Sequence, residues 1–386
     1  MVWKELKVEE QRLNFIKEHI EARIAFAELC QNYGISRKTG YKWLERFLAR
    51  GEGGLRDLSK APHSHPHELS KEIVEAILEM KETYSTWGAK KIHAKLQALQ
   101  PNIKLPSVNS VGNVLARHGL VCPRRYRKRV PETAPLAHCT EANNVWAYDF
   151  KGWFLTGDGS KCEPFTITDC HTRYLLKCTS LRRKRALDVW SVFESLFYEY
   201  GLPLKVRSDN GPPFATTGAG RLSMLSIRLI KAGVIPEWIA TGKPQENGRH
   251  ERFHLTLKNE TTSPPAVTLK RQEGVFQKFQ YYYNNERPHE ALGQKTPGSI
   301  YKASERVWDG KLRPPEYADH QIVRKVMKCG CIGWKGHNIF ISETLYREYI
   351  GIVEQEDGYS ELSYGPIRLG WINLNKKFIK QKLEAS

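Results

Sequence analysis

Hydrophobic positions recur at helical spacing through the first part of the chain. Between residues 10 and 48 this pattern is broken once, at Gly34, and Ser36 follows two positions later. Glycine can adopt the positive φ of a tight turn and serine can cap the next helix, so the segment predicts a helix-turn-helix. Arg37, Lys38 and Lys42 then fall on the exposed early turns of the second helix, where such a helix meets DNA. A helical hairpin whose basic residues are simply solvated is the alternative.

A second helical segment follows a stretch rich in glycine, proline and histidine. Residues 70–84, 89–99 and 107–118 carry helical spacing, and the last of these ends at Gly119. A second helix-turn-helix is therefore plausible. The chain then enters a run of cationic residues, Arg124, Arg125, Arg127, Lys128 and Arg129. This density of charge suits contacts with DNA phosphates, and a solvated linker is the alternative.

From about residue 143 the pattern changes to short strands interspersed with helices. The segments that predict strands are 146–150, 164–169, 174–179 and 204–209, and residues 186–200 alternate like a helix. This order predicts a mixed sheet with helices packed on it. After a polar stretch, further short strands at 336–341 and 349–353 predict a small β-barrel or sheet.

The chain is therefore expected to be multidomain, with α-helical helix-turn-helix modules, an α/β core and a small all-β C-terminal domain. At 386 residues it is too long for one ordinary domain. The expected parts are helix-turn-helix domain 1–58, linker 59–69, second helical DNA-binding domain 70–121, basic linker 122–142, catalytic core 143–301, linker 302–320 and C-terminal domain 321–386.

The net charge of the chain indicates what kind of partner it binds. Lys and Arg outnumber Asp and Glu by 60 to 42, and a formal charge of +18 indicates a polyanionic partner, usually nucleic acid. An anionic membrane surface would attract the same charge, but no apolar run is long enough to span a bilayer, so an intracellular protein without a membrane partner is expected. The eight cysteines lack a repeating spacing and are expected to be mostly reduced thiols, with a structural zinc site as the alternative.

Two acidic residues stand at the ends of predicted strands. Asp149 follows one apolar strand, and Asp209 ends another, immediately before Asn210 and Gly211, which suit a tight turn. A third carboxylate lies within residues 244–258, where a loop leads into a predicted helix. Three acids packed together repel one another unless a cation lies between them. Two magnesium ions would fill that role and would serve phosphoryl transfer.

Four sequence blocks carry a family resemblance. They are Trp146-Ala-Tyr-Asp149, Arg207-Ser-Asp-Asn-Gly-Pro-Pro-Phe214, Pro244-Gln-Glu-Asn-Gly-Arg-His-Glu-Arg-Phe-His254, and a block from Tyr283 to Pro297 containing Tyr-Asn-Asn-Glu-Arg-Pro-His. In this order they resemble the catalytic core of retroviral integrases and related bacterial insertion-sequence transposases, the RNase H-like family with an Asp, Asp, Glu triad.

The resemblance implies that Asp149, Asp209 and Glu251 are catalytic and bind two ions of Mg²⁺ or Mn²⁺. It implies a DNA transposase that binds terminal inverted repeats, cleaves the ends by hydrolysis and joins the 3′ ends to target DNA. A multimer holding two ends, in the nucleoid of a bacterial cytoplasm, is expected with it. The alternatives are a catalytically silent DNA-binding regulator and a related metal-dependent nuclease.

The third acid has a rival. The family commonly separates its second Asp from its Glu by a number of residues in the mid-thirties, whereas 41 residues lie between Asp209 and Glu251 and 36 lie between Asp209 and Glu246. Glu251 is favoured because it falls on the helix, three residues after Gly248, where a ligand is held more rigidly. The small residues of 215–222 suit a short insertion that would account for the longer spacing.

Three further residues of these blocks receive interpretations. Lys258 lies two turns after Glu251 on the same helix face and, by the resemblance, could hold a terminal phosphate of DNA. The alternative for Lys258 is an ordinary exposed lysine. Arg287 and His289 are expected to be structural, with the Asn and Arg of their block bonding backbone, and no catalytic role is assigned to them.

Overall fold

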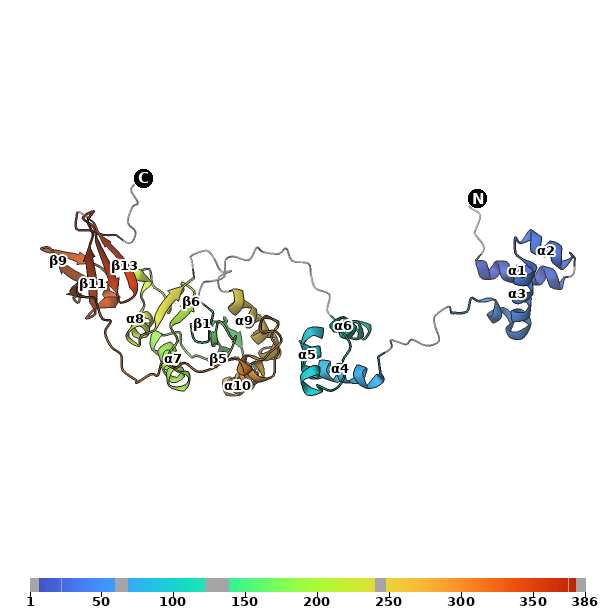
Figure 1. Ribbon diagram of the computed structural model, residues 1–386, viewed down its shortest axis with the longest axis horizontal. Helices are drawn as coiled ribbons and strands as arrows, with labels where there is room; N and C mark the ends of the chain where they lie inside the picture. The colour runs from blue at the N-terminus through green and yellow to red at the C-terminus, as the bar shows by residue number, and fades with distance from the viewer. Residues whose placement is uncertain are drawn as a thin grey trace. The chain divides into compact units, whose positions relative to one another are not determined.

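The computed structural model describes residues 7–21, 23–59, 69–121, 139–239, 248–373 and 375–379 (Figure 1). The chain divides into two compact units, Met1–Leu69 and Ser70–Ser386. Within the described ranges, no helix combines the length and the apolar character that crossing a membrane requires. The seven cysteines that fall in these ranges are all free thiols.

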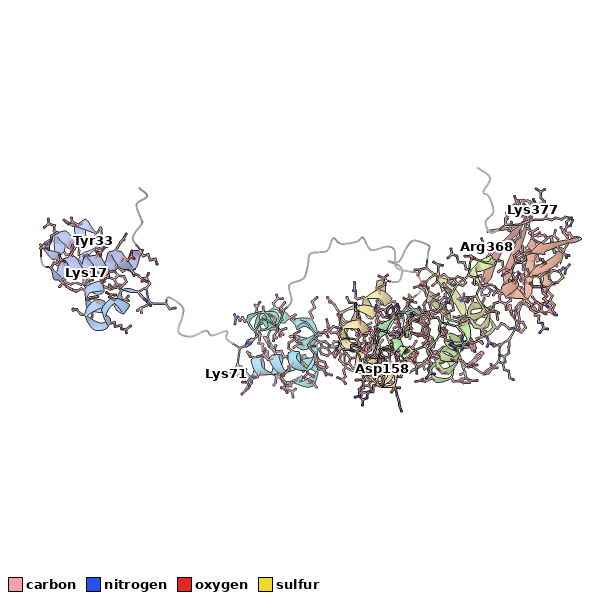
Figure 2. All side chains as sticks on the ribbon, turned by 180° about the vertical axis from the view of Figure 1, so that it is seen from behind. Lys17, Tyr33, Lys71, Asp158, Arg368 and Lys377 are labelled. Carbon is pink, nitrogen blue, oxygen red and sulfur yellow. The ribbon has the colours of Figure 1, made fainter. Side chains whose placement is uncertain are left out.

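The first unit is a small helical domain with its own core. Its elements are α1 Val8–Ile20, α2 Phe26–Asn32, α3 Arg37–Arg50 and the 3-10 turn η1 Gly51–Leu55. Phe15, Ile16 and Leu29 are buried between the helices. Tyr33, directly after α2 (Figure 2), donates a hydrogen bond of 2.6 Å to Glu18 of α1 and so fixes the angle between these helices.

The turn between α2 and α3 has the geometry that the sequence predicts. Gly34 has a φ of +65°, and the Ser36 hydroxyl accepts a hydrogen bond of 3.2 Å from the backbone N–H of Thr39. This contact satisfies one of the unpaired N–H groups at the start of α3. The predicted helix-turn-helix is therefore confirmed.

A second helical module opens the second unit. It consists of α4 Lys71–Thr83, α5 Ala89–Leu99 and α6 Val108–Arg117, which match the three helices expected there. Ser107 caps α6 by accepting from the backbone N–H of Ser110 at 3.2 Å, and Gly119 follows the helix with a φ of +67°. Ile77, Ile92 and their apolar neighbours form the buried face of the three helices.

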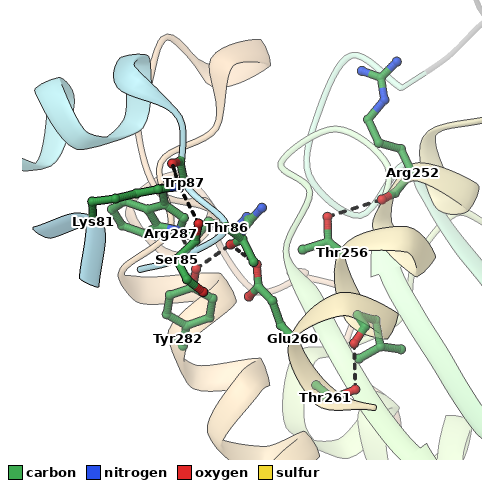
Figure 3. A network of polar contacts seen from close by, with 11 residues as sticks. Lys81, Ser85, Thr86, Trp87, Arg252, Thr256, Glu260, Thr261, Tyr282 and Arg287 are labelled. Carbon is green, nitrogen blue, oxygen red and sulfur yellow. Dashed lines mark hydrogen bonds and ion pairs between the residues drawn. The ribbon is translucent and has the colours of Figure 1, made fainter. Parts of the chain in front are cut away.

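This module contacts the expected catalytic core, residues 143–301, which is called the catalytic region below. The contact is made through the turn between α4 and α5 (Figure 3). Trp87 is completely buried, stacks on Tyr84 with ring centroids 4.0 Å apart, and donates from Nε1 to the Tyr282 hydroxyl at 2.5 Å. The Thr86 hydroxyl donates to Glu260 at 2.7 Å, and Glu260 also pairs with Arg287. Because its aromatic rings are buried and their polar groups are hydrogen-bonded, this is a specific interface between the helical module and the catalytic region.

The catalytic region is centred on a five-stranded sheet of order β5-β4-β1-β6-β7. The strands are β1 Val145–Phe150, β4 Pro164–Asp169, β5 Leu175–Ser180, β6 Lys205–Ser208 and β7 Ile235–Trp238, and β2 Phe154–Leu155 and β3 Lys161–Cys162 form a separate hairpin. Strand β1 is antiparallel to β4 and parallel to β6, which is itself parallel to β7. The mixed sheet is as predicted.

Strand alternation divides the side chains of this sheet between two helical layers. Trp146 and Tyr148 of β1 pack with α7 Ala186–Tyr200 and α8 Met224–Lys231. The intervening positions of β1, which include Asp149, face the opposite side. There α9 Gly248–Thr261 contacts β1, and α9 and α10 Leu269–Asn285 share a second buried cluster with β5. Asp149 therefore faces the layer that carries Glu251.

The C-terminal region is all β among its described residues, apart from one 3-10 turn. A five-stranded antiparallel sheet of order β14-β13-β12-β11-β8 is accompanied by the hairpin β9-β10. The bounds are β8 Ile322–Lys325, β9 Cys331–Trp334, β10 His337–Phe340, η6 Glu343–Leu345, β11 Tyr349–Glu354, β12 Ser360–Tyr364, β13 Ile367–Ile372 and β14 Phe378–Ile379. The two end strands of this sheet, β14 and β8, do not pair with each other, so the described part is an open sheet.

The C-terminal sheet shares a hydrophobic core with the catalytic region. Ile227 and Ile230 of α8, together with Ala219 of the 3-10 turn η2 Ala219–Arg221, are buried in the same cluster as the side chains of the C-terminal strands. The polar stretch 302–320 also lies against the catalytic region, because Trp308 is buried against α7. Hydrophobic contacts therefore cross the domain boundaries that were expected at the two ends of this stretch. The boundaries themselves stay predictions.

Candidate active site

Asp149 lies at the carboxyl-terminal part of β1 on the side of the sheet that α9 covers. Its Oδ1 accepts a hydrogen bond of 2.7 Å from the backbone N–H of Phe150. Burial, followed by the negative charge of Asp209, raises the pKa of Asp149 from 3.8 to about 7, against smaller opposing effects that include Lys184. A carboxyl whose ionisation is disfavoured in this way is a candidate functional group.

Asp209 follows β6, the parallel neighbour of β1. The carboxyl ends of adjacent parallel strands meet at one edge of a sheet, which is why these two acids, distant in sequence, interact. Asp209 Oδ1 accepts from the backbone N–H of Gly211 at 3.1 Å, which is the turn predicted for Asp209-Asn-Gly211. The charge of Asp209 disfavours the ionisation of Asp149, and a hard divalent cation between them would remove that cost.

Glu251 lies in the first turn of α9 with an exposed side chain, and the structure does not bring it into contact with the two aspartates. Its rival Glu246 lies outside the described residues. Within the described ranges, no group of three or more His, Cys, Asp or Glu side chains is close enough to hold a metal ion. The structure thus assembles Asp149 with Asp209 and leaves Glu251 apart from them.

Two histidines of α9 lie closer to the aspartates, and the sequence reasoning assigned them no role. His254 Nδ1 lies 3.9 Å from Asp149 Oδ2, and His254 Nε2 lies 2.8 Å from the Thr166 hydroxyl. His250 bonds the hydroxyls of Thr166 and Thr168. Burial lowers the pKa of His250 to about 3 and of His254 to about 2, so both rings are neutral at physiological pH.

A signal for these histidines was present in the sequence. His250 and His254 are four residues apart and share a helix face with Leu257, which is fully buried. Polar residues on the buried face of a helix need hydrogen-bond partners, which the threonines of β4 supply. The spacing alone could therefore have predicted that they are buried, whereas their nearness to Asp149 depends on how α9 lies on the sheet.

The candidate DNA-binding residues divide between described and undescribed parts of the chain. Arg37, Lys38 and Lys42 have exposed side chains on the first two turns of α3. Lys258 is exposed on α9, seven residues after Glu251 and so on the same face. The cationic run Arg124, Arg125, Arg127, Lys128 and Arg129 lies outside the described residues.

The block after α10 has structural contacts, with one difference from the prediction. The Asn284 side chain bonds both the backbone N–H and the carbonyl of Leu175 on β5, as expected. Arg287 was expected to bond backbone, but its guanidinium instead pairs with Glu260 and donates to the Tyr282 hydroxyl at 3.0 Å. The prediction for Arg287 was wrong because α9 places the Glu260 carboxylate, and α10 the Tyr282 hydroxyl, within reach of its guanidinium.

The raised pKa of Asp149 predicts a pH-dependent stability in metal-free buffer. The unfolded chain ionises this carboxyl near pH 4, whereas the folded protein keeps it protonated up to about pH 7. Its contribution to the free energy of unfolding therefore falls as the pH rises from about 4 to 7, by at most about 1.4 kcal/mol per pH unit.

Urea unfolding at pH 5.5 and pH 7.5, with EDTA present, measures this contribution. The wild-type protein should lose more stability between the two pH values than Asp149→Asn, because the amide cannot ionise. The comparison of the two proteins cancels the titration of other groups. An identical change in both would contradict the assignment of a raised pKa to Asp149.

Models of known protein families match three parts of the chain. Residues 232–297 match an integrase core domain, residues 39–115 a homeodomain-like domain and residues 11–63 a helix-turn-helix domain. The first match includes α9, α10 and the Tyr-Asn-x-x-Arg-Pro-His block. The other two cover the helical modules in which the sequence predicted DNA binding.

Two curated relatives come from bacterial insertion elements. The insertion element IS407 uncharacterized 31.7 kDa protein of Burkholderia multivorans is 25% identical over 245 residues, which cover 61% of this chain and 82% of the relative. The insertion element IS476 uncharacterized 39.2 kDa protein of Xanthomonas euvesicatoria is 24% identical over 254 residues, 64% of this chain and 70% of the relative.

Among solved structures, the HTLV-2 integrase catalytic core domain in complex with magnesium is 16% identical, with a TM-score of 0.34, and the match covers 42% of this chain and 98% of that chain. The family matches and the insertion-element relatives carry the assignment. They support a DNA transposase that combines helix-turn-helix domains with an integrase-type catalytic domain.

Proposed function

We propose that Asp149, Asp209 and Glu251 form the catalytic site of this transposase and bind two divalent ions, Mg²⁺ or Mn²⁺. The observation that carries the proposal is the pair of aspartates at one sheet edge, where burial and mutual repulsion raise the pKa of Asp149 to about 7. Carboxylate oxygens are the ligands that hard cations prefer. Glu251 supports the set by its place on α9, one turn before His254, whose ring lies 3.9 Å from Asp149.

The proposed reaction has two steps in one site. Water hydrolyses a phosphodiester bond at the transposon end, and the freed 3′ hydroxyl then attacks a phosphodiester bond of target DNA. When bound, the two metal ions would activate the attacking oxygen and stabilise the departing one. Asp149 and Asp209 hold their carboxylates on a strand and a tight turn, and Lys258 would contact a terminal phosphate of the DNA. No covalent enzyme intermediate is required.

The helical modules would bind the terminal inverted repeats. Arg37 and Lys38 on α3 would contact base edges, with Lys42 beside them, and the cationic run 124–129 would contact phosphates. Both transposon ends must be held during the reaction, so we propose a multimeric complex on DNA in the bacterial nucleoid. The exposure of the three α3 cations supports their availability to DNA.

A strand-transfer assay tests this function. The full chain is incubated with duplexes that carry the ends of its own element and with a circular target, in Mg²⁺, in Mn²⁺ and in EDTA. We expect joined products with either metal and none in EDTA, because the carboxylates alone cannot activate the attacking oxygen. A duplex of the same length with a scrambled end is the control for end recognition.

The same assay separates the alternatives. Cleavage without joined products would indicate a metal-dependent nuclease. Binding of the ends without cleavage or joining in either metal would indicate a silent regulator and would overturn the proposal.

A further inference from the structure

The side chain of Asn210 joins the turn that carries Asp209 to two other segments. Its Nδ2 donates to the carbonyl oxygen of Ile239 at 2.8 Å, and its Oδ1 accepts from Arg221 Nη1 at 2.9 Å. Ile239 directly follows β7 and precedes the stretch that leads to α9 and Glu251. One amide therefore connects the turn of Asp209 to the end of β7 and to Arg221.

The backbone that carries Arg221 is fixed by the C-terminal sheet. Ala219, the first residue of the turn η2, and Leu222, which directly follows it, are each 1% exposed and belong to the core shared with β13. A Cβ on Gly220 would lie 2.9 Å from a methyl carbon of Leu369, so the turn approaches β13 as closely as a glycine allows. Arg221 itself has a φ of +58°, a conformation that the surrounding packing must hold.

Metal ligands need support from residues that hold them in place, because displacements of about half an ångström weaken a site. The Asp209 carboxylate accepts a hydrogen bond from the N–H of Gly211. The side chain of Asn210 adds two contacts that tie this turn to Ile239 and to Arg221. Removing them would leave the turn with fewer restraints and its carboxylate less well placed.

We infer that Arg221, seated on the C-terminal sheet, is a positioning residue for Asp209 that acts through Asn210. The C-terminal sheet thereby supports the metal-binding geometry of the catalytic region. The inference rests on the proposed metal site. It also gives a role to residues 215–222, which lengthen the interval between Asp209 and Glu251. These residues pack against the C-terminal sheet and place Arg221 within hydrogen-bond distance of Asn210.

The test measures metal binding directly, with Mn²⁺ as the probe and the full chain as the protein. Free Mn²⁺ is followed by electron paramagnetic resonance for the wild type, Arg221→Ala, Asn210→Ala and the double variant. We expect each single variant to bind Mn²⁺ roughly tenfold more weakly, the lower end of the effect of residues that orient metal ligands. The double variant should be no weaker than either single one, because both changes break the same contact.

Two further variants separate positioning from a general structural role. Arg221→Lys keeps a donor and should recover part of the affinity. Arg368→Ala removes an exposed arginine of β13 (Figure 2) that pairs with Glu361, and it should bind Mn²⁺ as the wild type does. Thermal unfolding of every variant reports whether the fold persists.

The outcomes are distinguishable. If Asp209→Asn abolishes Mn²⁺ binding and Arg221→Ala does not weaken it, the inference is wrong and the proposed function stands. If the effects of Arg221→Ala and Asn210→Ala are additive, coupling through Asn210 is wrong. If the wild type binds no Mn²⁺, or Asp209→Asn binds it normally, the proposed metal site and this inference both fall.

Discussion

Asp209→Asn is expected to lower the rate of strand transfer by about a thousandfold or more while leaving the binding of transposon ends unchanged. The substitution replaces a charged oxygen ligand by a neutral amide of almost the same shape. Loss of about 4 kcal/mol of charge stabilisation in the transition state corresponds to this factor. The helical modules that would bind the ends lie elsewhere in the chain, so end binding should persist.

The structure provides reasons for the fold to tolerate this change. Asp209 Oδ1 accepts a hydrogen bond from the N–H of the nearby Gly211, and an amide oxygen can accept the same bond. The neighbouring Asp149 would lose a repulsive charge, so its pKa should fall from about 7. Asp319→Asn, at an exposed aspartate, is the matched control and should leave strand transfer unaffected. Wild-type rates in Asp209→Asn would remove Asp209 from the mechanism.

Much of the fold could be predicted because its signals are local. Gly34 and Ser36 specify a turn and a cap within three residues, and the structure has both. The strands that carry Asp149 and Asp209 are short apolar runs whose ends are visible in the sequence. Carboxylates at such ends converge through sheet geometry, which requires no knowledge of side-chain packing. The pairing of the two aspartates could therefore be predicted from the sequence.

The contacts that could not be predicted join residues far apart in the chain. Arg287 pairs with Glu260 beneath a turn of the second helical module, and nothing near Arg287 in sequence indicates that turn. Residues 215–222 looked like a loop insertion, yet Ala219 is buried against the C-terminal strands. In both cases a polar or small segment gains its role from a surface supplied by another part of the fold.

A pair of substitutions decides whether Glu251 or Glu246 is the third acid of the site. Glu251→Gln is expected to reduce strand transfer by about a thousandfold, whereas Glu246→Gln should change it by less than about tenfold. The reason is rigidity: Glu251 belongs to α9, which is anchored to β4 by His250 and His254, while Glu246 precedes the helix. A ligand on an anchored helix keeps its position with less loss of conformational freedom.

Both substitutions remove one charge and preserve shape, so each serves as the control for the other. End binding and thermal stability should match the wild type in both, because the Glu251 side chain is exposed and its charge is not needed by the fold. Mn²⁺ binding should weaken in Glu251→Gln alone. The reverse result, with activity and metal binding lost in Glu246→Gln, would make Glu246 the third ligand. The two aspartates would keep their roles.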